Sequence, residues 1–540
     1  MITIITFVLF TALVAVLTWL ITRGKGTNTE DGFFLAGRSL TGLVIAGSLL
    51  LTNLSTEQLV GLNGGAFKEG LSVMCWEVIA GMSLVLMALF FLPRYLKSGI
   101  ATIPQFLEER YDAKVRALTT AIFIVAYMLI LLPFVLYSGA QALSDMLDLP
   151  ALLGLGGTQT IWAVVAFIAI VGSAYAIFGG LRAVAVSDTF NGLGLLIGGI
   201  MITWFSLKYA AGDGSIGAVF KEIKADNPDA FASLGKPGES VHWPTLFTGV
   251  LLLNFFYWCS NQQIIQRTFG AKNLAEGQKG VLLAAFFKIL APLILVLPGI
   301  VALYVANQNG DFNQSLLNDE GVRADSKVYG SLVRLVLPGP LTGFFAAVVV
   351  GSILSTFNSV LNSSATLFSL GVYKKVINKN ATTEEVVKSG RLCSALVALF
   401  AAIGAPLIFM GRDGIFAFFQ VLNGVYFIPL LTIILVGFFN RTADGTSAFI
   451  TAIVGLVIMA FGTFYNGGIS LFGSGFHFMG AVFVFLVILQ VALGTFMKRS
   501  EPYVQQDAGL VDLTPWKPAK LVGGLMVAIV LVLYLSLAKG

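Results

Sequence analysis

The sequence predicts an all-α polytopic membrane protein with about 14 transmembrane helices, each needing roughly 20 apolar residues. Hydrophobic residues make up 57% of the 540 residues and charged residues only 11%, whereas a soluble protein carries about 25% charged residues. Apolar runs follow one another along the whole chain with short polar breaks. Most basic residues lie in these breaks, where membrane topology explains them. The chain is therefore expected to form one transmembrane domain, residues 1–540.

The predicted spans begin close to the N-terminus. Residues 3–22 carry no charge, and Arg23 and Lys25 follow them, which is the reverse of the order in a signal peptide. We therefore expect a first spanning helix with its N-terminus outside. The full set of predicted spans is 3–22, 42–66, 71–93, 117–139, 160–178, 184–207, 244–266, 281–305, 340–373, 391–410, 415–438, 445–465, 476–497 and 521–538.

The distribution of Lys and Arg supports this count. With the N-terminus outside, the breaks that face the cytoplasm hold more than twice as many basic residues as the exterior breaks and the C-terminus together. This agrees with the positive-inside rule. The sequence predicts a multi-pass protein of the cell (inner) membrane, with both termini outside.

Composition makes several other classes of protein improbable. The net charge of +5 is small, so no nucleic-acid partner is expected. The three cysteines form no CxxC pair, and the two histidines have no metal-ligand partner at helical spacing. A membrane enzyme would need a nucleophile–base pair or a metal cluster, and neither is evident. The sequence does not indicate an oligomeric state.

Two spans contain clusters of polar residues that would not face lipid. The second span includes LTNLSTEQLVGLNGG, residues 51–65, and the seventh includes Asn254, Tyr257, Asn261, Gln262 and Gln263. Interrupted helices at matching places in two halves of a chain are the sequence sign of a transporter binding site. The alternative is that these side chains only join helices by hydrogen bonds.

Single charges occur within two other spans. Glu77 and Lys288 each cost at least ~2.5 kcal/mol at the bilayer centre. A carboxylate that accepts and an ammonium that donates suit a polyhydroxyl ligand, to which the amide of Gln420 would add. The alternatives are a structural ion pair and, for Gln420, a helix-packing contact. Nearby rings at Trp76, Tyr257 and Phe416 are candidates for stacking on a sugar or closing a pocket, although core packing is the commoner role of an aromatic side chain.

Hydroxyl groups gather in the span 340–373. Ser352, Ser355 and Thr356 fall at positions i, i+3 and i+4 on one helix face, and sodium, a hard cation, takes oxygen ligands. The alternative is that these hydroxyls bond back to their own helix. Asp188 follows GGLRAVAVS and is a candidate second ion ligand, a gate, or a partner of Arg182.

The motifs EDGFFLAGRSL, LTNLSTEQLVG, GGLRAVAVSD, NQQIIQRTFGAKNLAEGQKG and LNSSATLF resemble the sodium:solute symporter family. The resemblance implies a leucine-transporter-like core of two inverted five-helix repeats, here 42–207 and 244–438. One extra helix and a cytoplasmic loop (1–41) would precede the repeats, and three extra helices (445–540) would follow.

The sodium/glucose and galactose branch of the family implies roles for particular residues. The matching sugar-binding positions are Gln58, Glu77, Asn254, Lys288 and Gln420, and the gate positions are Leu62, Trp76, Tyr257 and Phe416. The sodium positions are the carbonyls of Leu51 and Leu54 with Ser352, Ser355 and Thr356, and Asp188 matches an aspartate linked to sodium exit or a second sodium. A family serine is replaced by Ala80, which removes one hydroxyl contact to the sugar.

The expected function is sodium-driven uptake of a glucose- or galactose-like sugar by alternating access. The alternatives are a sodium symporter for a carboxylate, vitamin or amino acid, a proton-coupled carrier, and a nutrient sensor that binds without transporting.

Overall fold

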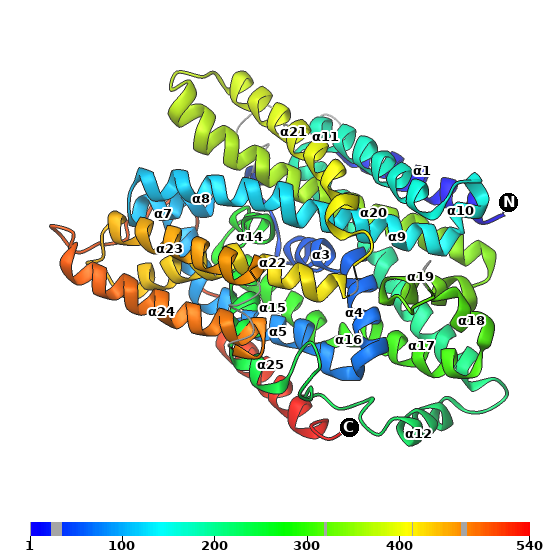
Figure 1. The fold of residues 1–540 in the computed structure, drawn as a ribbon. Coiled ribbons are helices and arrows are strands. Elements are labelled where there is room, and N and C mark those ends of the chain that lie inside the picture. The colour runs from blue at the N-terminus through cyan, green and yellow to red at the C-terminus, as the bar shows by residue number, and fades with distance from the viewer. Residues whose placement is uncertain (1, 23–34, 318–320, 413, 466–471) are drawn as a thin grey trace.

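The computed structural model describes residues 2–22, 35–317, 321–412, 414–465 and 472–540; side chains are not described at residues 4, 15, 18, 19, 21, 22, 36, 51, 52 and 174–189. The described chain is almost entirely helical (Figure 1). Its elements are α1 (Ile2–Thr22), η1 (Ala36–Arg38), α3 (Gly42–Asn53), α4 (Thr56–Glu69), η2 (Gly70–Met74), α5 (Cys75–Leu86), η3 (Met87–Phe91), α6 (Leu92–Ser98), α7 (Ile103–Arg110), α8 (Ala113–Ala126), η4 (Tyr127–Leu131), α9 (Leu132–Leu147), α10 (Leu149–Leu153), α11 (Gly157–Ala211), α12 (Ile216–Asp226), η5 (Trp243–Phe247), α13 (Gly249–Ser260), α14 (Gln262–Phe269), α15 (Leu274–Leu290), α16 (Pro292–Leu295), α17 (Leu297–Gln308), α18 (Gly310–Ser315), α19 (Asp325–Val336), α20 (Gly339–Phe368), η6 (Ser369–Ile377), α21 (Thr383–Phe409), α22 (Ile415–Phe439), α23 (Gly445–Phe464), α24 (Gly475–Phe496) and α25 (Ala519–Ser536).

Every predicted span coincides with at least one of these helices, but the count of about fourteen is not confirmed. Among the described residues, nine helices are long and apolar enough to cross a membrane, or ten if the bent pair Leu274–Leu290 and Pro292–Gln308 is one span. Part of the difference arises because some predicted spans are divided into short helices. For example, α3 and α13 have only 12 residues each. Two further predicted spans, 3–22 and 160–178, extend into residues whose side chains are not described.

The helices form a bundle with polar connections at its two ends. In Figure 1, α7 and the segment between α24 and α25 lie at the left end, and α12 and α18 lie at the right end. The sequence assigns the first pair to the cytoplasm and the second pair to the exterior, so the two sets of breaks are separated as topology requires. Which end faces the cytoplasm stays a prediction.

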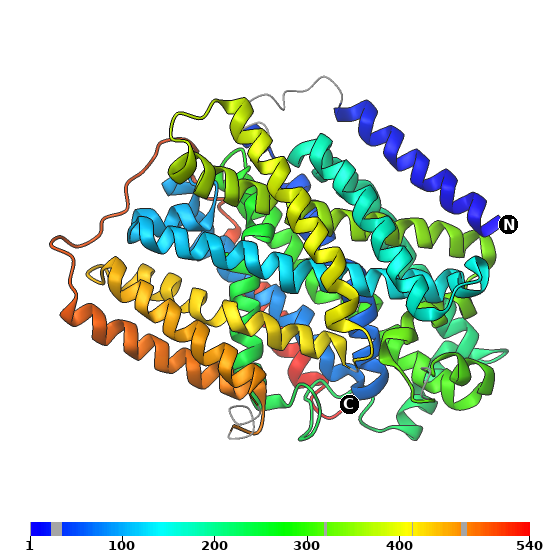
Figure 2. The same cartoon turned by 45° about the horizontal axis from the view of Figure 1, so that its top comes forward.

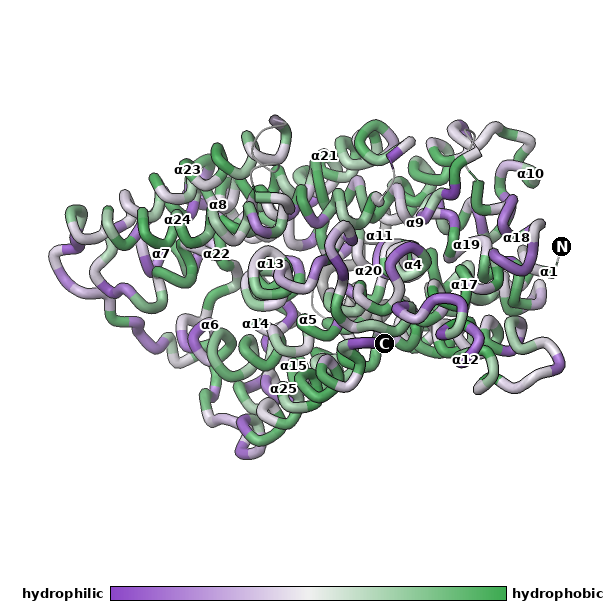
Figure 3. Tube along the Cα trace, turned by 60° about the horizontal axis from the view of Figure 1, so that its bottom comes forward, coloured by the Kyte–Doolittle hydropathy of each residue, from purple (hydrophilic) through white to green (hydrophobic). Residues whose placement is uncertain are grey.

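The helices differ strongly in how much of their surface the bundle covers. The most apolar stretch of Gly339–Ile377, which contains α20, is 89% buried, whereas that of α25 is 22% buried. Figure 2 shows α1 as an outer helix, and Figure 3 shows hydrophobic residues predominating along peripheral helices such as α23 and α25. A peripheral apolar surface is what contact with lipid requires, and α20 is therefore a central element.

Helix α4 lies against α17 and α19 with almost no side chain between the backbones. A Cβ atom at Gly299 of α17 would lie closer than 3.0 Å to the carbonyl of Asn63, and one at Gly64 would lie 2.5 Å from the carbonyl of Asp325. Glycine is needed at both places because only a residue without a Cβ permits such an approach. The three helices therefore form one tightly packed unit.

Candidate functional site

Two helices near the middle of the bundle are interrupted, as the polar clusters predict. Helix α3 ends at Asn53, Leu54 and Ser55 are non-helical, and α4 begins at Thr56. Helix α13 ends at Ser260 and α14 begins after the extended Asn261. Each interruption frees backbone carbonyls from helical pairing, and such carbonyls are available to bind cations or ligands.

The interruption at Asn261 is stabilised by a tyrosine from another helix. The Tyr127 hydroxyl donates to Asn261 Oδ1 at 2.6 Å and accepts from the backbone N–H of Gln263 at 3.0 Å. Tyr127 begins the π-helical turn η4. The break is thus held by fixed hydrogen bonds rather than left open to lipid.

A buried ion pair lies beside the first interruption. Lys288 Nζ of α15 is 2.5 Å from Glu77 Oε2 of α5, with side chains 0% and 2% exposed. Lys288 also donates to Asn53 Oδ1 and lies 5.3 Å from the centre of the Trp258 ring. The two charges predicted from the sequence are therefore partners, and Asn53 at the end of α3 completes their hydrogen bonding.

Tyr257 connects the two interrupted helices. Its hydroxyl accepts a hydrogen bond from Asn53 Nδ2 at 3.0 Å and from Gln263 Nε2 at 3.3 Å. Because the oxygen accepts both bonds, its own proton remains to be donated to a further group. A residue that the sequence marks as a gate thus links the end of α3 to the start of α14.

These residues lie around a cavity of about 30 Å³. Of the predicted substrate residues, Gln58, Glu77, Asn254 and Gln420 line it, and Lys288 contacts it through Glu77. The complete lining is Asn53, Glu57, Gln58, Trp76, Glu77, Leu131, Leu253, Asn254, Tyr257, Trp258, Phe419, Gln420 and Phe427. The volume suits a water molecule, whereas pockets for small molecules measure about 300–1,000 Å³. The structure is therefore a conformation with the cavity closed.

Two acceptors in the lining lack partners. Glu57 Oε2 and Gln58 Oε1 are both buried without a hydrogen bond in the described structure. By contrast, the Asn254 amide donates to Val250 O at 3.0 Å, and Gln420 Oε1 accepts from Asn423 Nδ2 at 3.1 Å. Buried acceptors are normally satisfied, so the unpartnered pair on α4 indicates a place where a ligand or water donates.

Two of the predicted gate residues, Trp76 and Phe416, contact each other. Their rings meet edge to face with centres 5.9 Å apart, and Leu62, on α4, is buried. The ring of Phe476, on α24, also contacts the Trp76 ring, and the two ring centres are 5.6 Å apart. The sequence did not indicate Phe476, because nothing local distinguishes one phenylalanine among 44.

Replacing Gly61 with Ala is expected to prevent this aromatic contact from closing. The added methyl would lie closer than 3.0 Å to the Phe416 ring, and such overpacking costs about 1–3 kcal/mol. We expect uptake to fall at least ~5-fold. Alkylation of Cys75, which is buried next to Trp76, should accelerate by a similar factor. Gly47→Ala is the matched control, since its methyl meets no atom within 4 Å; equal behaviour of the two variants would contradict the gate.

Two of the predicted sodium residues, Leu54 and Ser352, meet at the first interruption. Ser352 Oγ of α20 donates to the Leu54 carbonyl at 3.3 Å, while Ser355 Oγ is buried without a hydrogen-bond partner. Thr356, one residue further, is 1% exposed. Leu51 lies in α3, but its side chain is outside the described set. A backbone carbonyl and a hydroxyl thus meet between the end of α3 and α20, and oxygens of this kind are the ligands that a hard cation prefers.

Asp188 cannot be placed relative to these oxygens. It lies within the helical stretch α11, but in the part, residues 174–189, whose side chains are outside the described set. Its assignment to a second ion or to ion exit stays a prediction.

A helical membrane bundle with two interrupted helices around a central polar cavity defines a secondary transporter. A family model described as the sodium:solute symporter family matches residues 33–455. The chain belongs to this family.

Two relatives and one solved structure extend the comparison. The chain is 43% identical over 540 residues to "Uncharacterized symporter YidK" of Escherichia coli (strain K12), covering 99% of this chain and 91% of the relative. It is 30% identical over 503 residues to the sodium/glucose cotransporter of Vibrio parahaemolyticus, covering 90% and 88%. A Na⁺-coupled sialic acid symporter in a substrate-bound outward-open state has a TM-score of 0.76 at 19% identity, covering 94% of this chain and 99% of that one. At that identity the likeness concerns the fold alone.

Family membership confirms several expectations. The protein is a sodium-coupled transporter rather than an enzyme, and it crosses the membrane several times. Its fold class is helical and leucine-transporter-like.

Proposed function

We propose that the protein couples inward sodium movement to the uptake of a sugar of the glucose or galactose type. The observation that carries this proposal is the pair of unpartnered buried acceptors, Glu57 Oε2 and Gln58 Oε1, in a cavity that also contains Glu77. A sugar presents several hydroxyl donors close together, and each would satisfy an acceptor that is otherwise buried at a cost. An anionic substrate would instead meet three acceptor side chains and be disfavoured.

In this proposal the polar residues divide the recognition of the sugar hydroxyls between them. Gln58 and Glu77 accept from hydroxyls, Lys288 donates while neutralising Glu77, and Asn254 and Gln420 supply amides. Tyr257 donates its free proton and closes the cytoplasmic side of the cavity, while Leu62, Trp76 and Phe416 close the exterior side. The closed cavity must widen to admit the sugar, because about 30 Å³ holds only water.

Sodium would bind between the Leu51 and Leu54 carbonyls and the hydroxyls of Ser352, Ser355 and Thr356. It would hold the end of α3 in place and so position Gln58, two residues into the first turn of α4. Sodium binding then raises sugar affinity, and sugar must raise sodium affinity by the same factor.

Alternating access would follow from two inverted repeats, 42–207 and 244–438, that rock about this central site. The N- and C-termini would lie outside. One sodium ion moving down ~100 mV gains about 2.3 kcal/mol, and a tenfold gradient adds about 1.4 kcal/mol. Together these would support roughly 500-fold sugar accumulation at one-to-one coupling.

Uptake of labelled glucose and galactose into proteoliposomes, with and without an inward sodium gradient, tests the proposal. Sodium-dependent accumulation of either sugar would support it. If active protein accumulates neither sugar, glucose and galactose are excluded as substrates. Other polyols would then be tested, because Ala80 replaces the family serine and removes one hydroxyl contact. Binding of a sugar without its transport would instead favour the nutrient sensor that binds without transporting.

A further inference from the structure

The structure has a second, larger cavity at the end of the bundle where α7 lies, and we call it the vestibule. Its volume is about 650 Å³, within the range of small-molecule pockets. Ala101, in the loop between α6 and α7, forms part of its wall. The sequence assigns this end of the bundle to the cytoplasm. The vestibule is therefore large enough to hold a small solute on its way out of the central cavity.

The first turn of α14 has contacts to both cavities. Gln263 Nε2 donates to the hydroxyl of Tyr257 at 3.3 Å, and Tyr257 lines the central cavity. Gln262 Nε2 donates to Ala101 O, in the wall of the vestibule, at 3.1 Å. Two adjacent residues thus bond to the lining of the two cavities. The first turn of α14 therefore lies between the central cavity and the vestibule.

Gln262 fixes this turn to the loop before α7. Its side chain is buried, with 0% of the residue exposed. Besides donating to Ala101 O, its amide accepts from the backbone N–H of Ile103 at 2.8 Å. Both ends of one amide are therefore bonded to one short loop. A buried amide has no water to replace these partners, so the turn loses both bonds when it leaves the loop.

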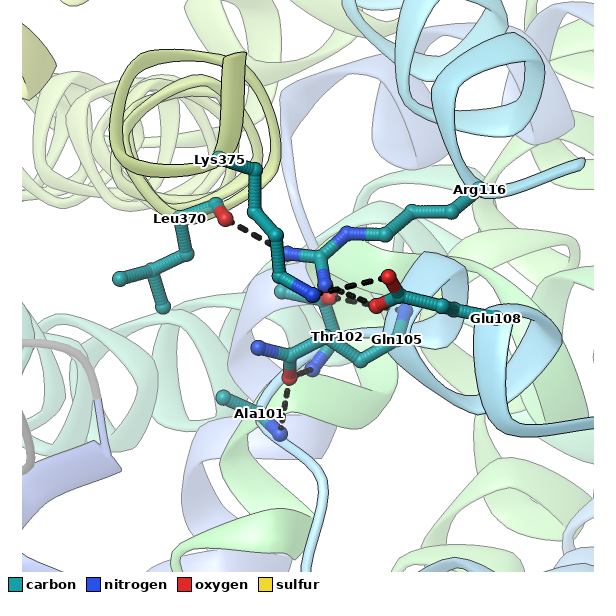
Figure 4. Close-up of polar contacts among 7 residues, drawn as sticks. All are labelled: Ala101, Thr102, Gln105, Glu108, Arg116, Leu370 and Lys375. Atoms are coloured by element: carbon teal, nitrogen blue, oxygen red, sulfur yellow. Dashed lines mark hydrogen bonds and ion pairs between the residues drawn. The ribbon is translucent and has the colours of Figure 1, made fainter. Parts of the chain in front are cut away.

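The loop that Gln262 binds is itself held in a fixed shape. Figure 4 shows Gln105, on α7, reaching back to it: Gln105 Oε1 accepts from the backbone N–H groups of Ala101 and Thr102 at 2.8 and 3.0 Å. The Thr102 side chain in turn accepts from the Gln105 N–H at 3.3 Å. This reciprocal capping fixes the entry of the chain into α7.

Helix α7 is anchored to two further elements. Figure 4 shows Glu108 between Arg116 of α8 and Lys375 of η6, and it forms an ion pair with each. Arg116 also donates to Leu370 O of η6 at 2.5 Å. The loop before α7 is thus a fixed support, and we expect α14 to be the element that moves away from it.

Two polar groups beside this contact are buried without partners in the described structure. They are Gln263 Oε1 and Asn261 Nδ2, and both residues are 0% exposed. Buried polar atoms are normally satisfied. An acceptor and a donor left at the helix break therefore indicate groups that water or a passing solute satisfies when the turn is displaced.

We propose that the first turn of α14 is the gate between the central cavity and the vestibule, and that Gln262 is the positioning residue that keeps it closed. The inference rests on the proposed passage of a substrate through the central cavity, but not on the identity of that substrate. When the gate opens, Gln262 leaves the loop before α7 and Gln263 leaves Tyr257, so that the two cavities join. The extended Asn261 supplies the hinge, because hinges lie at element ends that absorb a change in φ and ψ.

The test measures how fast a thiol in the central cavity reacts with a membrane-impermeant thiol reagent. Asn254→Cys places this thiol in the cavity lining, and a cavity of about 30 Å³ admits no reagent until it opens. The full-length protein is assayed in right-side-out and in inside-out membrane vesicles, so that each face is probed separately. Peptide mass spectrometry distinguishes the new thiol from the three native cysteines, which are buried.

Gln262→Met, added to Asn254→Cys, removes both hydrogen bonds of the gate and keeps the buried volume. The thiol should react about tenfold faster from one face only, as expected for the loss of two ordinary hydrogen bonds. Gln262→Asn is one methylene shorter and should act in the same direction, including where Gln262→Met does not fold. Gln278→Met is the matched control, since the buried Gln278 amide also has two backbone partners, Ala88 O and the Trp516 N–H.

A faster reaction from one face in the Gln262 variants, with the Gln278 control unchanged, supports the gate. Equal rates in the Gln262 variants and the control, or a rise from both faces, overturns the inference. Thermal unfolding midpoints check that each variant is folded. Alkylation needs no substrate, so protein that behaves as expected here but takes up neither glucose nor galactose would keep the gate and lose the proposed sugar.

Discussion

Replacing Glu77 with Gln is expected to abolish sodium-driven uptake and to destabilise the protein. The substitution leaves the Lys288 ammonium buried without its partner, since that side chain is 0% exposed. Removing one member of a buried ion pair costs about 3–5 kcal/mol. Lys288→Met should have the same effects, because it leaves the Glu77 carboxylate buried without its cationic partner. Thermal unfolding and uptake in proteoliposomes measure the two effects.

A double variant separates ligand binding from stability. Glu77→Gln/Lys288→Met removes both charges of the pair, so its stability should return to within about 1–2 kcal/mol of wild type. Its uptake should remain absent, because the carboxylate acceptor and the ammonium donor are both gone. If this variant transports as well as wild type, the Glu77–Lys288 pair has a structural role and does not bind the substrate. Lys236→Met, at the surface pair with Asp229, is the control and should change stability by less than about 1 kcal/mol.

Replacing Thr356 with Val is expected to raise the sodium concentration for half-maximal uptake by roughly 10–100-fold. The variant keeps the buried volume but removes one hydroxyl oxygen, a loss of about 1.4–3 kcal/mol in sodium binding. Ser355→Ala should act similarly. At low sodium the apparent affinity for sugar should fall too, because the coupling is reciprocal. Uptake as a function of sodium concentration gives both quantities.

Ser364→Ala is the matched control on the same helix. Its hydroxyl is buried, but it donates to Val360 O of its own helix at 2.9 Å. Its loss should leave the sodium dependence unchanged. If Thr356→Val and Ser355→Ala also leave it unchanged, the ion does not bind between α3 and α20.

The interrupted helices could be predicted because their polar clusters would not face lipid. Asn53 and its neighbours would not face lipid, and helix α3 ends at Asn53 in the structure. The pairing of Glu77 with Lys288 was open from the sequence, since two lone charges in separate spans give no distance. Only the packing of α5 against α15 brings them together.

Other parts of the site could not be predicted, because they depend on contacts between distant segments. Glu57 belongs to the same cluster as Gln58, yet nothing in the sequence indicated that both side chains line the cavity. Phe419 and Phe427 line the cavity through the rotation of α22, which an apolar sequence without periodic contrast does not fix. Tyr127 lies in an otherwise apolar run, and its bond to Asn261 joins residues 134 positions apart.

The close contact of α4 with α17 offers a means of watching the protein work. The backbones of the two helices approach each other closely at Gly299. We therefore expect α17 to move together with α4. Gln308, exposed at the end of α17, is a suitable attachment point for a fluorescent dye. The dye would follow the movement of Gln58 in single molecules while every residue around the cavity remains native.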